Sequence, residues 1–214
     1  MLTDRKDAGE QLAKKLETYA GADVVVLALP RGGVVVGYEI ARALSLPLDI
    51  VIVRKIGHPS NPECAVGAVG EDGTPLLSEE AAMVDQALLR AEIASERKEA
   101  KRRGAIYREG RSAPNVAGKT VIIADDGIAT GLTMQLALRA VKTQKPKKVI
   151  VAVPVAPPDA FPVLKREGAD ETIVLEPPET FRGAVGAHYE RFGQIQDAEV
   201  LRLLRAARRR QRFE

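Results

Sequence analysis

The sequence predicts an α/β fold, with a parallel five-stranded sheet flanked by helices and interrupted by a lid or hood insertion. Short apolar runs rich in β-branched residues recur along the chain, as expected for strands buried on both faces. Segments with helical spacing alternate with these runs, which favours parallel pairing. Two of the predicted strands lead into a glycine-containing loop and then a helix, an arrangement typical of ligand-binding α/β sheets.

The predicted elements follow one another along the chain. Leu12, Leu16 and Tyr19 stand among charged residues, so residues 3–20 are expected to form an amphipathic helix that covers the sheet. The five predicted strands are residues 23–29, 48–53, 121–124, 147–153 and 171–175. Helices are expected at 34–44, from Leu132 through Val141, and at 157–167, where Pro158 lies in the first turn and Gly168 ends the helix.

The chain is treated as one domain, 1–214, with three less regular parts. Residues 56–115 form the predicted lid insertion, with a hairpin turned at Asp72-Gly73 and a helix from Glu79 to Arg103. Residues 177–196, here called the hood, are kept irregular by prolines and glycines. Residues 197–214 are expected to form a basic terminal helix capped by Asp197.

Composition excludes several classes of protein. The chain has no apolar run of about 18 residues and no apolar leader, so we expect a cytoplasmic protein that does not enter a membrane. Its single cysteine, Cys64, permits no internal disulfide and no cysteine metal cluster. The net charge of +3 comes from the end of the chain, because residues 201–214 hold six Arg and one Glu.

The arginine-rich end has two interpretations, which both stay open at this point. Leu203, Leu204 and Ala207 give it an apolar face suited to docking on the body or on a second subunit in a homodimer. A run of arginines can also bind nucleic acid. For these arginines we favour a solvated helix end over nucleic-acid binding, since cations suit the negative end of a helix dipole.

The stretch from Lys119 to Met134 carries the strongest functional signal. A buried strand ends there on Asp125 and Asp126, a turn of small residues follows, and a helix then begins. The unpaired N–H groups and the dipole of a helix N-terminus bind phosphate, and two carboxylates accept hydrogen bonds from paired ribose hydroxyls. A carboxylate beside a phosphate also attracts Mg²⁺. The spacing fits neither a dinucleotide fingerprint nor a Walker loop.

At these residues the chain resembles the type I phosphoribosyltransferases, whose motif is an apolar strand, two acidic residues, a short turn and T-G-x-T. The resemblance implies binding of 5-phosphoribosyl diphosphate (PRPP) with Mg²⁺. Asp125 and Asp126 would hold the ribose hydroxyls, favour positive charge on the ring and bind the metal through water. The residues that would anchor the 5′-phosphate are Ala129, Thr130, Gly131 and Thr133. Gly127 stands where many members carry an apolar residue, so a looser turn is expected there.

Two further loops agree with this resemblance. PRGG, at 30–33, follows the first predicted strand, and by the resemblance Arg31 and Gly32 cradle the pyrophosphate. The predicted strand at 48–53 ends on Arg54 and Lys55, as in the adenine phosphoribosyltransferase pattern, and these cations would stabilise the leaving pyrophosphate during catalysis. Ala129 also matches the adenine type, whereas the 6-oxopurine enzymes carry an acid there.

The lid and the hood supply weaker candidates. His58, Glu63 and Glu71 lie in the lid, where relatives carry proton-transfer groups, but solvated loop residues are the favoured interpretation. In relatives the hood recognises the base, so Phe181 and Tyr189 are candidates for stacking on it. Packing of these rings onto the core is an equally weighted alternative.

The predicted function is that of an enzyme, a phosphoribosyltransferase of nucleotide metabolism. It would transfer the 5-phosphoribosyl group from Mg-PRPP to a nitrogen acceptor, in the first place a nucleobase, with release of pyrophosphate. The alternative is a non-catalytic sensor of PRPP or nucleotides whose arginine-rich tail reaches nucleic acid. The presence of both pyrophosphate-side elements, PRGG and VRK, favours the enzyme. A phosphosugar kinase or hydrolase is disfavoured, because the sequence has no P-loop and no pairing of nucleophile and base.

Overall fold

The computed structural model describes residues 1–211 except 22, 72 and 74. These residues form two compact units, which are described separately. The first unit comprises Met1–Val51 and Ala113–Glu214, and the second comprises Ile52–Ser112. Almost all of the insertion predicted at 56–115 therefore falls in the second unit.

The sheet of the first unit is parallel throughout and confirms the predicted fold class. Five strands of the described chain form it in the order β2-β1-β6-β7-β8. Their bounds are Leu48–Ile50 for β2, Val24–Ala28 for β1, Thr120–Ala124 for β6, Lys148–Val153 for β7 and Glu171–Val174 for β8. Strands β1, β6 and β7 lie at the centre and are almost entirely buried, which explains their continuous runs of Val, Ile and Ala.

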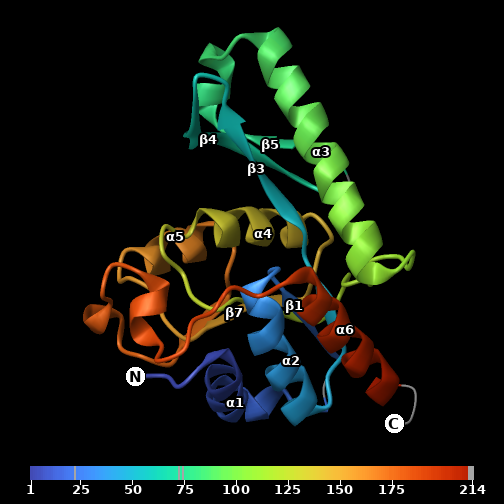
Figure 1. Ribbon diagram of the computed structural model, residues 1–214, viewed down its shortest axis with the longest axis vertical. Helices are drawn as coiled ribbons and strands as arrows, with labels where there is room; N and C mark the ends of the chain where they lie inside the picture. The colour runs from blue at the N-terminus through green and yellow to red at the C-terminus, as the bar shows by residue number, and fades with distance from the viewer. Residues whose placement is uncertain (22, 72, 74, 212–214) are drawn as a thin grey trace. The chain divides into compact units, whose positions relative to one another are not determined.

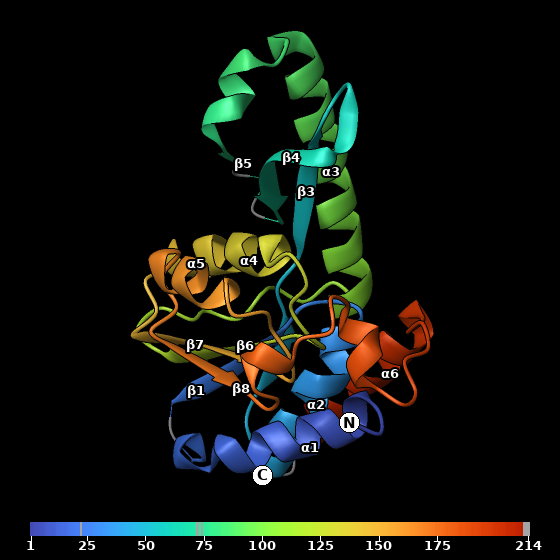
Figure 2. The same ribbon diagram turned by 90° about the vertical axis from the view of Figure 1, so that its left-hand side faces the viewer.

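Helices cover both faces of this sheet, as Figures 1 and 2 show. Helices α1 (Arg5–Lys15) and α2 (Gly32–Leu44) lie on one face, and α4 (Leu132–Lys142) and α5 (Ala160–Arg166) lie on the other. The predicted helix 3–20 is shorter than expected, because α1 ends at Lys15 and a 3₁₀ turn, η1 (Glu17–Tyr19), follows. No helix in the described ranges is long and apolar enough to cross a lipid bilayer.

The basic terminal helix α6 (Asp197–Gln211) docks on the body of the first unit, against α2 and β2. The side chains of its apolar face are buried, namely Val200, Leu203, Leu204 and Ala207. The arginines at positions 202, 205, 209 and 210 are exposed on the other side. The apolar face of the tail thus docks on the body, one of the two docking partners that the sequence left open.

The second unit is an antiparallel sheet covered by a long helix. Strands β3 (Val53–His58), β4 (Asn61–Gly70) and β5 (Pro75–Leu77) pair in that order, and α3 (Gln86–Arg108) packs on β3 and β4. The second unit has its own core, made of Ile56, Val66, Val69, Ala81, Val84 and Leu89. Pairing of β4 with β5 confirms the predicted hairpin, although Asp72 of its turn lies outside the described residues.

Two predicted elements of this region have different bounds in the structure. The strand predicted at 48–53 stops at Ile50, and Arg54 and Lys55 lie inside β3 rather than beyond a strand end. The helix predicted from Glu79 starts only at Gln86, because the Asp85 side chain caps it by accepting the N–H groups of Ala87 and Leu88. A 3₁₀ turn, η2 (Glu79–Met83), precedes this cap.

Candidate active site

The two acidic residues of the central motif lie directly after β6, at the carboxyl end of the parallel sheet. Asp125 Oδ1 accepts the backbone N–H of Asp126 at 2.8 Å, and Asp126 Oδ2 accepts Arg5 Nε at 2.7 Å. The side chains of the two acids also lie within hydrogen-bonding reach of each other. One oxygen of each acid is thus held in place, and the other can accept a ligand hydroxyl or coordinate a cation.

Burial and a neighbouring charge make ionisation of Asp125 unfavourable. Burial raises the pKa of Asp125 well above its usual value, and the adjacent charge of Asp126 raises it further. The Arg5 guanidinium acts in the opposite direction on the pKa of Asp125, but more weakly. Arg5 therefore offsets only part of the repulsion between the two acids. A bound cation or hydroxyl donor would relieve more of it.

A small-residue loop follows the acid pair and opens α4. Gly131 is the N-cap of α4 with φ of 78°, a left-handed conformation that favours glycine, and Thr130 and Thr133 are exposed beside it. A cleft of about 170 Å³ lies over this loop. It is lined by Asp125, Gly127, Ile128, Ala129, Thr130, Gly131, Thr133, Met134 and Val185. The structure thus brings Asp125 and the four predicted 5′-phosphate residues to one cleft.

The turn at Gly127 is tightly packed, which corrects the looser turn expected from the sequence. A Cβ atom at this position would lie 2.5 Å from Val185 Cγ1 and 2.8 Å from Val155 Cγ2. Gly127 also has a φ of 151°, which disfavours other residues. The apolar residue found here in many relatives has no room, because Val185 of the hood closes over the turn.

The PRGG loop meets the acid pair from the neighbouring strand. A Cβ at Gly32 would lie 1.9 Å from Asp126 Oδ2, and one at Gly33 would lie 2.8 Å from Asp125 Oδ1. Arg31, the N-cap of α2, follows a cis peptide bond and places its Nη1 3.7 Å from Asp197 Oδ1 of α6. Both glycines are therefore needed for the close approach of the loop to the carboxylates.

Tyr189 of the hood, one of the two residues predicted to stack on the base, supports Asp126. Tyr189 is 6% exposed, stacks on Phe192 with ring centroids 4.9 Å apart, and donates its hydroxyl to the Asp126 carbonyl at 2.7 Å. Burial raises the pKa of the Tyr189 hydroxyl, which stays protonated as a donor. With its ring covered by protein, Tyr189 has no open face for a base, which corrects that prediction.

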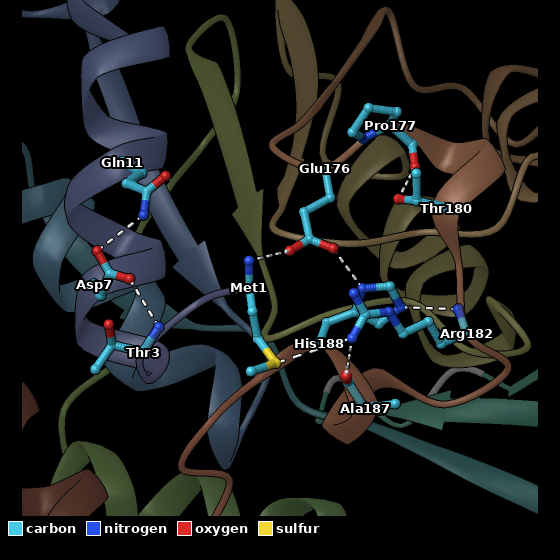
Figure 3. A network of polar contacts seen from close by, with 10 residues as sticks. All are labelled: Met1, Thr3, Asp7, Gln11, Glu176, Pro177, Thr180, Arg182, Ala187 and His188. Atoms are coloured by element: carbon cyan, nitrogen blue, oxygen red, sulfur yellow. Dashed lines mark hydrogen bonds and ion pairs between the residues drawn. The ribbon is translucent and has the colours of Figure 1, made fainter.

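The second candidate, Phe181, also uses a ring face inside the hood. It stacks on His188 with centroids 5.4 Å apart, and its own side chain is half-buried. Figure 3 shows how His188 is held: its Nδ1 lies 2.5 Å from Glu176 Oε2, and its Nε2 accepts the Arg182 N–H at 3.0 Å. The Met1 amino group lies 3.7 Å from the other oxygen of Glu176. Phe181 and Tyr189 both pack with Leu2, Ala8 and Val155, and a role of Phe181 in base stacking stays a prediction.

With this geometry in place, comparison with known proteins identifies the family. The model of the family described as "Phosphoribosyl transferase domain" matches residues 2–187. The chain is a type I phosphoribosyltransferase family member. The match is to the family as a whole, and the likeness to the adenine type stays a prediction.

The similar proteins agree with this family. The chain is 43% identical over 213 residues to proteins of Mycobacterium tuberculosis strains CDC 1551 / Oshkosh and H37Rv, each named "Putative phosphoribosyl transferase". These matches cover 98% of this chain but only 47% of each relative, so the chain spans about half the length of these curated relatives. It is also similar to the crystal structure of the protein TT1426 from Thermus thermophilus, at 44% identity and a TM-score of 0.83, covering 95% of this chain and 98% of that one.

The second unit of the chain carries the remaining candidates. In β3, Arg54 Nε donates to Glu96 Oε2 of α3 at 2.6 Å, and Lys55 follows it in the same strand. Among the lid residues, His58 Nδ1 accepts the Ser60 N–H at 3.1 Å and Glu71 forms an ion pair with the buried Arg108. The Glu63 side chain lies outside the described residues.

Arg5 is the site residue that sequence reasoning missed. It lies in the first turn of α1, is 8% exposed, and reaches Asp126 across 121 positions of the chain. A weak signal does exist in the sequence. Asp4 is an N-cap residue, and a cation directly after it opposes the helix dipole, so Arg5 needs a partner elsewhere.

Proposed function

We propose that this chain is a catalytically active phosphoribosyltransferase. It transfers the 5-phosphoribosyl group of Mg-PRPP to a nitrogen acceptor and releases pyrophosphate. A nucleobase is the favoured acceptor. The observation that carries the proposal is the single cleft in which Asp125 and the loop Ala129–Gly131 meet at the end of β6. A phosphorylated sugar needs a loop that binds its phosphate and a carboxylate that binds its hydroxyls, separated by no more than the length of the sugar.

The loop residues bind the 5′-phosphate in this proposal. Gly131 opens α4, so the backbone N–H groups of the first turn and the positive end of the helix dipole face the loop. The exposed Thr130 and Thr133 add hydroxyl donors, and Ala129 lines the same cleft. Fixing the phosphate at this end of the substrate positions the ribose over the acid pair.

Asp125 and Asp126 bind the ribose hydroxyls and stabilise the transition state. Displacement at C1 builds positive charge on the ribose ring, and carboxylates held nearby lower the energy of that charge. One oxygen of each carboxylate is already fixed by an N–H donor, so the other can be aimed at the substrate.

The same carboxylates fit a magnesium ion. Mg²⁺ prefers oxygen ligands, keeps several waters, and commonly combines one or two carboxylates with substrate phosphates. Asp125 and Asp126 would supply the protein's share, through water. When bound with PRPP, the ion supplies charge that stabilises the departing pyrophosphate.

The pyrophosphate side is assigned by residue type and by the family resemblance. Arg31 and Gly32 come from the loop that approaches the acid pair, and Arg54 and Lys55 come from β3. A guanidinium matches phosphate geometry with two parallel hydrogen bonds. In Arg54, Nε is bonded to Glu96, which among the described residues leaves both Nη atoms to make such a pair.

The test is a pyrophosphate-release screen of the purified protein with Mg-PRPP and adenine, guanine, hypoxanthine, uracil or orotate. Release that depends on one acceptor is the expected result and names the substrate. Binding of PRPP without release for any acceptor would contradict the proposed enzyme and favour the sensor. In that case, salt-sensitive binding of RNA or DNA would support a role of the arginine-rich tail.

A further inference from the structure

We propose that Arg5 is a positioning residue that fixes the orientation of the Asp126 carboxylate and links it to the hood. The inference rests on the proposed function for its consequence, namely tight binding of Mg-PRPP. It assigns a role to the start of α1, which the motif of the family does not include.

The Arg5 guanidinium is held in three independent ways. Its Nε donates to Asp126 Oδ2 at 2.7 Å, and its Nη1 donates to the Gly193 carbonyl at 2.8 Å. Its central carbon lies 3.8 Å from the centroid of the Phe192 ring, a cation–π geometry. The two hydrogen bonds fix the orientation of the guanidinium plane, and packing on the Phe192 ring fixes its position. The plane therefore cannot rotate without losing a contact.

The stability of α1 alone does not explain this arginine. A positive charge in the first turn opposes the helix dipole, and the cap of α1 is made by the neighbouring Asp4. An arginine with 8% exposure is stable only when its charge is paired. Asp126 is the carboxylate paired with it, and this carboxylate is itself only 18% exposed.

The surrounding structure is shaped around the ion pair. A Cβ at Gly32 would lie 1.9 Å from Asp126 Oδ2 and 2.9 Å from Arg5 Nε, so the loop that precedes α2 leaves room for both groups. Phe192 stacks on Tyr189, whose hydroxyl donates to the Asp126 carbonyl. Asp126 is thus held at its carboxylate by Arg5 and at its backbone by the hood.

This arrangement has a consequence for catalysis. Because Arg5 occupies Oδ2, the other oxygen of Asp126 is the one presented to a ligand. A partner that orients a ligating carboxylate typically contributes 10- to 100-fold, roughly, to metal affinity or activity. We therefore expect the affinity for Mg-PRPP to depend on Arg5 although Arg5 itself need not touch the substrate.

The experiment compares Arg5→Gln, Arg5→Lys and a matched control, Arg191→Gln. Arg191 joins the hood to the same N-terminal segment through Asp4 at 2.7 Å, but it is exposed and does not contact Asp126. Calorimetry should show Mg-PRPP binding weakened about 10- to 100-fold in R5Q. Binding should recover in part in R5K, which keeps the charge, and stay near wild type in R191Q. Equal affinities for R5Q and the wild type would overturn the inference.

A crystal structure of R5Q separates this inference from the proposed function. We expect the Asp126 carboxylate to turn away from its wild-type position; an unchanged carboxylate would overturn the inference even if no variant binds PRPP. Absence of binding in the wild type would instead contradict the proposed function. Should R5Q not fold, R5K carries the test, because an ammonium group cannot reproduce the paired hydrogen bonds of the guanidinium to Asp126 and to the Gly193 carbonyl; wild-type Mg-PRPP affinity in R5K would overturn the role of Arg5.

Discussion

Gly32 is the residue at which the PRGG loop meets the acid pair. Replacing it with alanine would place a methyl group 1.9 Å from Asp126 Oδ2, so the ion pair with Arg5 must move. We expect Gly32→Ala to weaken Mg-PRPP binding about 10- to 100-fold, the effect of losing a supporting contact of a ligating carboxylate. Calorimetry measures this loss, with a melting curve as the check on folding. Wild-type affinity in a folded variant would contradict the assigned contact.

At this scale, the local sequence predicted the candidate site residues but not the side chains that support them. Asp125, Thr130 and Gly131 stand within one short motif, so their residue types and spacing point directly to a phosphate and its sugar. Arg5 and Phe192 reach Asp126 only through the tertiary fold, and no spacing in the sequence marks that contact. Tyr189 was assigned to the base because aromatic residues suit stacking, whereas its burial made it a hydrogen-bond donor to the backbone.

Among the secondary-structure elements, α1 presents Arg5 and depends on its cap. The Asp4 side chain accepts the N–H groups of Lys6 and Asp7, each at 3.0 Å. We expect Asp4→Ala to lower the free energy of unfolding by about 1 kcal/mol at neutral pH. Asp4→Asn is the matched control. Asn caps a helix as well as Asp does, so this variant keeps the cap and loses only the contact with Arg191.

The stabilisation by Asp4 should depend on pH. The Asp7 N–H and then Arg191 hold the pKa of Asp4 below its usual value of 3.8. A carboxyl whose pKa is lowered by folding stabilises the protein above its unfolded pKa, and this stabilisation is lost as pH falls through the folded pKa. Urea denaturation at pH 7 and at successively lower pH should show the difference between wild type and Asp4→Ala shrinking below 3.8. A difference that persists in strong acid would contradict the cap.

The terminal helix α6 gives a second prediction for a single element. Leu204 is 1% exposed where α6 docks on the body, so Leu204→Ala should lower the free energy of unfolding by about 2–5 kcal/mol. Arg209→Ala, on the exposed side of the same helix, is the control and should change it little. Thermal or urea denaturation measures both variants. A small effect at Leu204 would mean that α6 is not docked in solution.

Elements were predictable where one periodicity dominates. The buried strands β1, β6 and β7 are continuous apolar runs, and their positions were predicted to within a residue or two. The strand predicted at 48–53 extends past the end of β2, because LDIVIV is apolar throughout and nothing local marks where β2 ends at Ile50 and β3 of the other sheet begins at Val53. The start of α3 was placed too early, since Asp85 was not recognised as the cap.

For the whole molecule, the order of strands and helices carries most of the functional information. Five parallel strands bring the ends of β1 and β6 side by side, so the loops that follow them, PRGG and the acid pair, meet. The sequence predicted that the PRGG loop lies at the carboxyl end of a strand, where open α/β sheets bind ligands, but not that β1 and β6 are neighbours. The division into two compact units was not predicted, since the insertion was treated as part of a single domain, whereas Ile56, Val66 and Leu89 give it a core of its own.

The central claim is that Asp125 and Asp126 bind Mg-PRPP, and calorimetric titration of the wild type and of the Asp125→Asn, Asp126→Asn double variant tests it most directly. We expect the wild type to bind PRPP in the presence of Mg²⁺. The double variant should bind about 100-fold more weakly or worse, since hydrogen bonds to charged groups contribute roughly 1.5–3 kcal/mol each. A melting curve of the double variant is the check on folding, because Asp126→Asn leaves the buried Arg5 without its carboxylate partner. Unchanged PRPP affinity in a folded double variant would contradict the account.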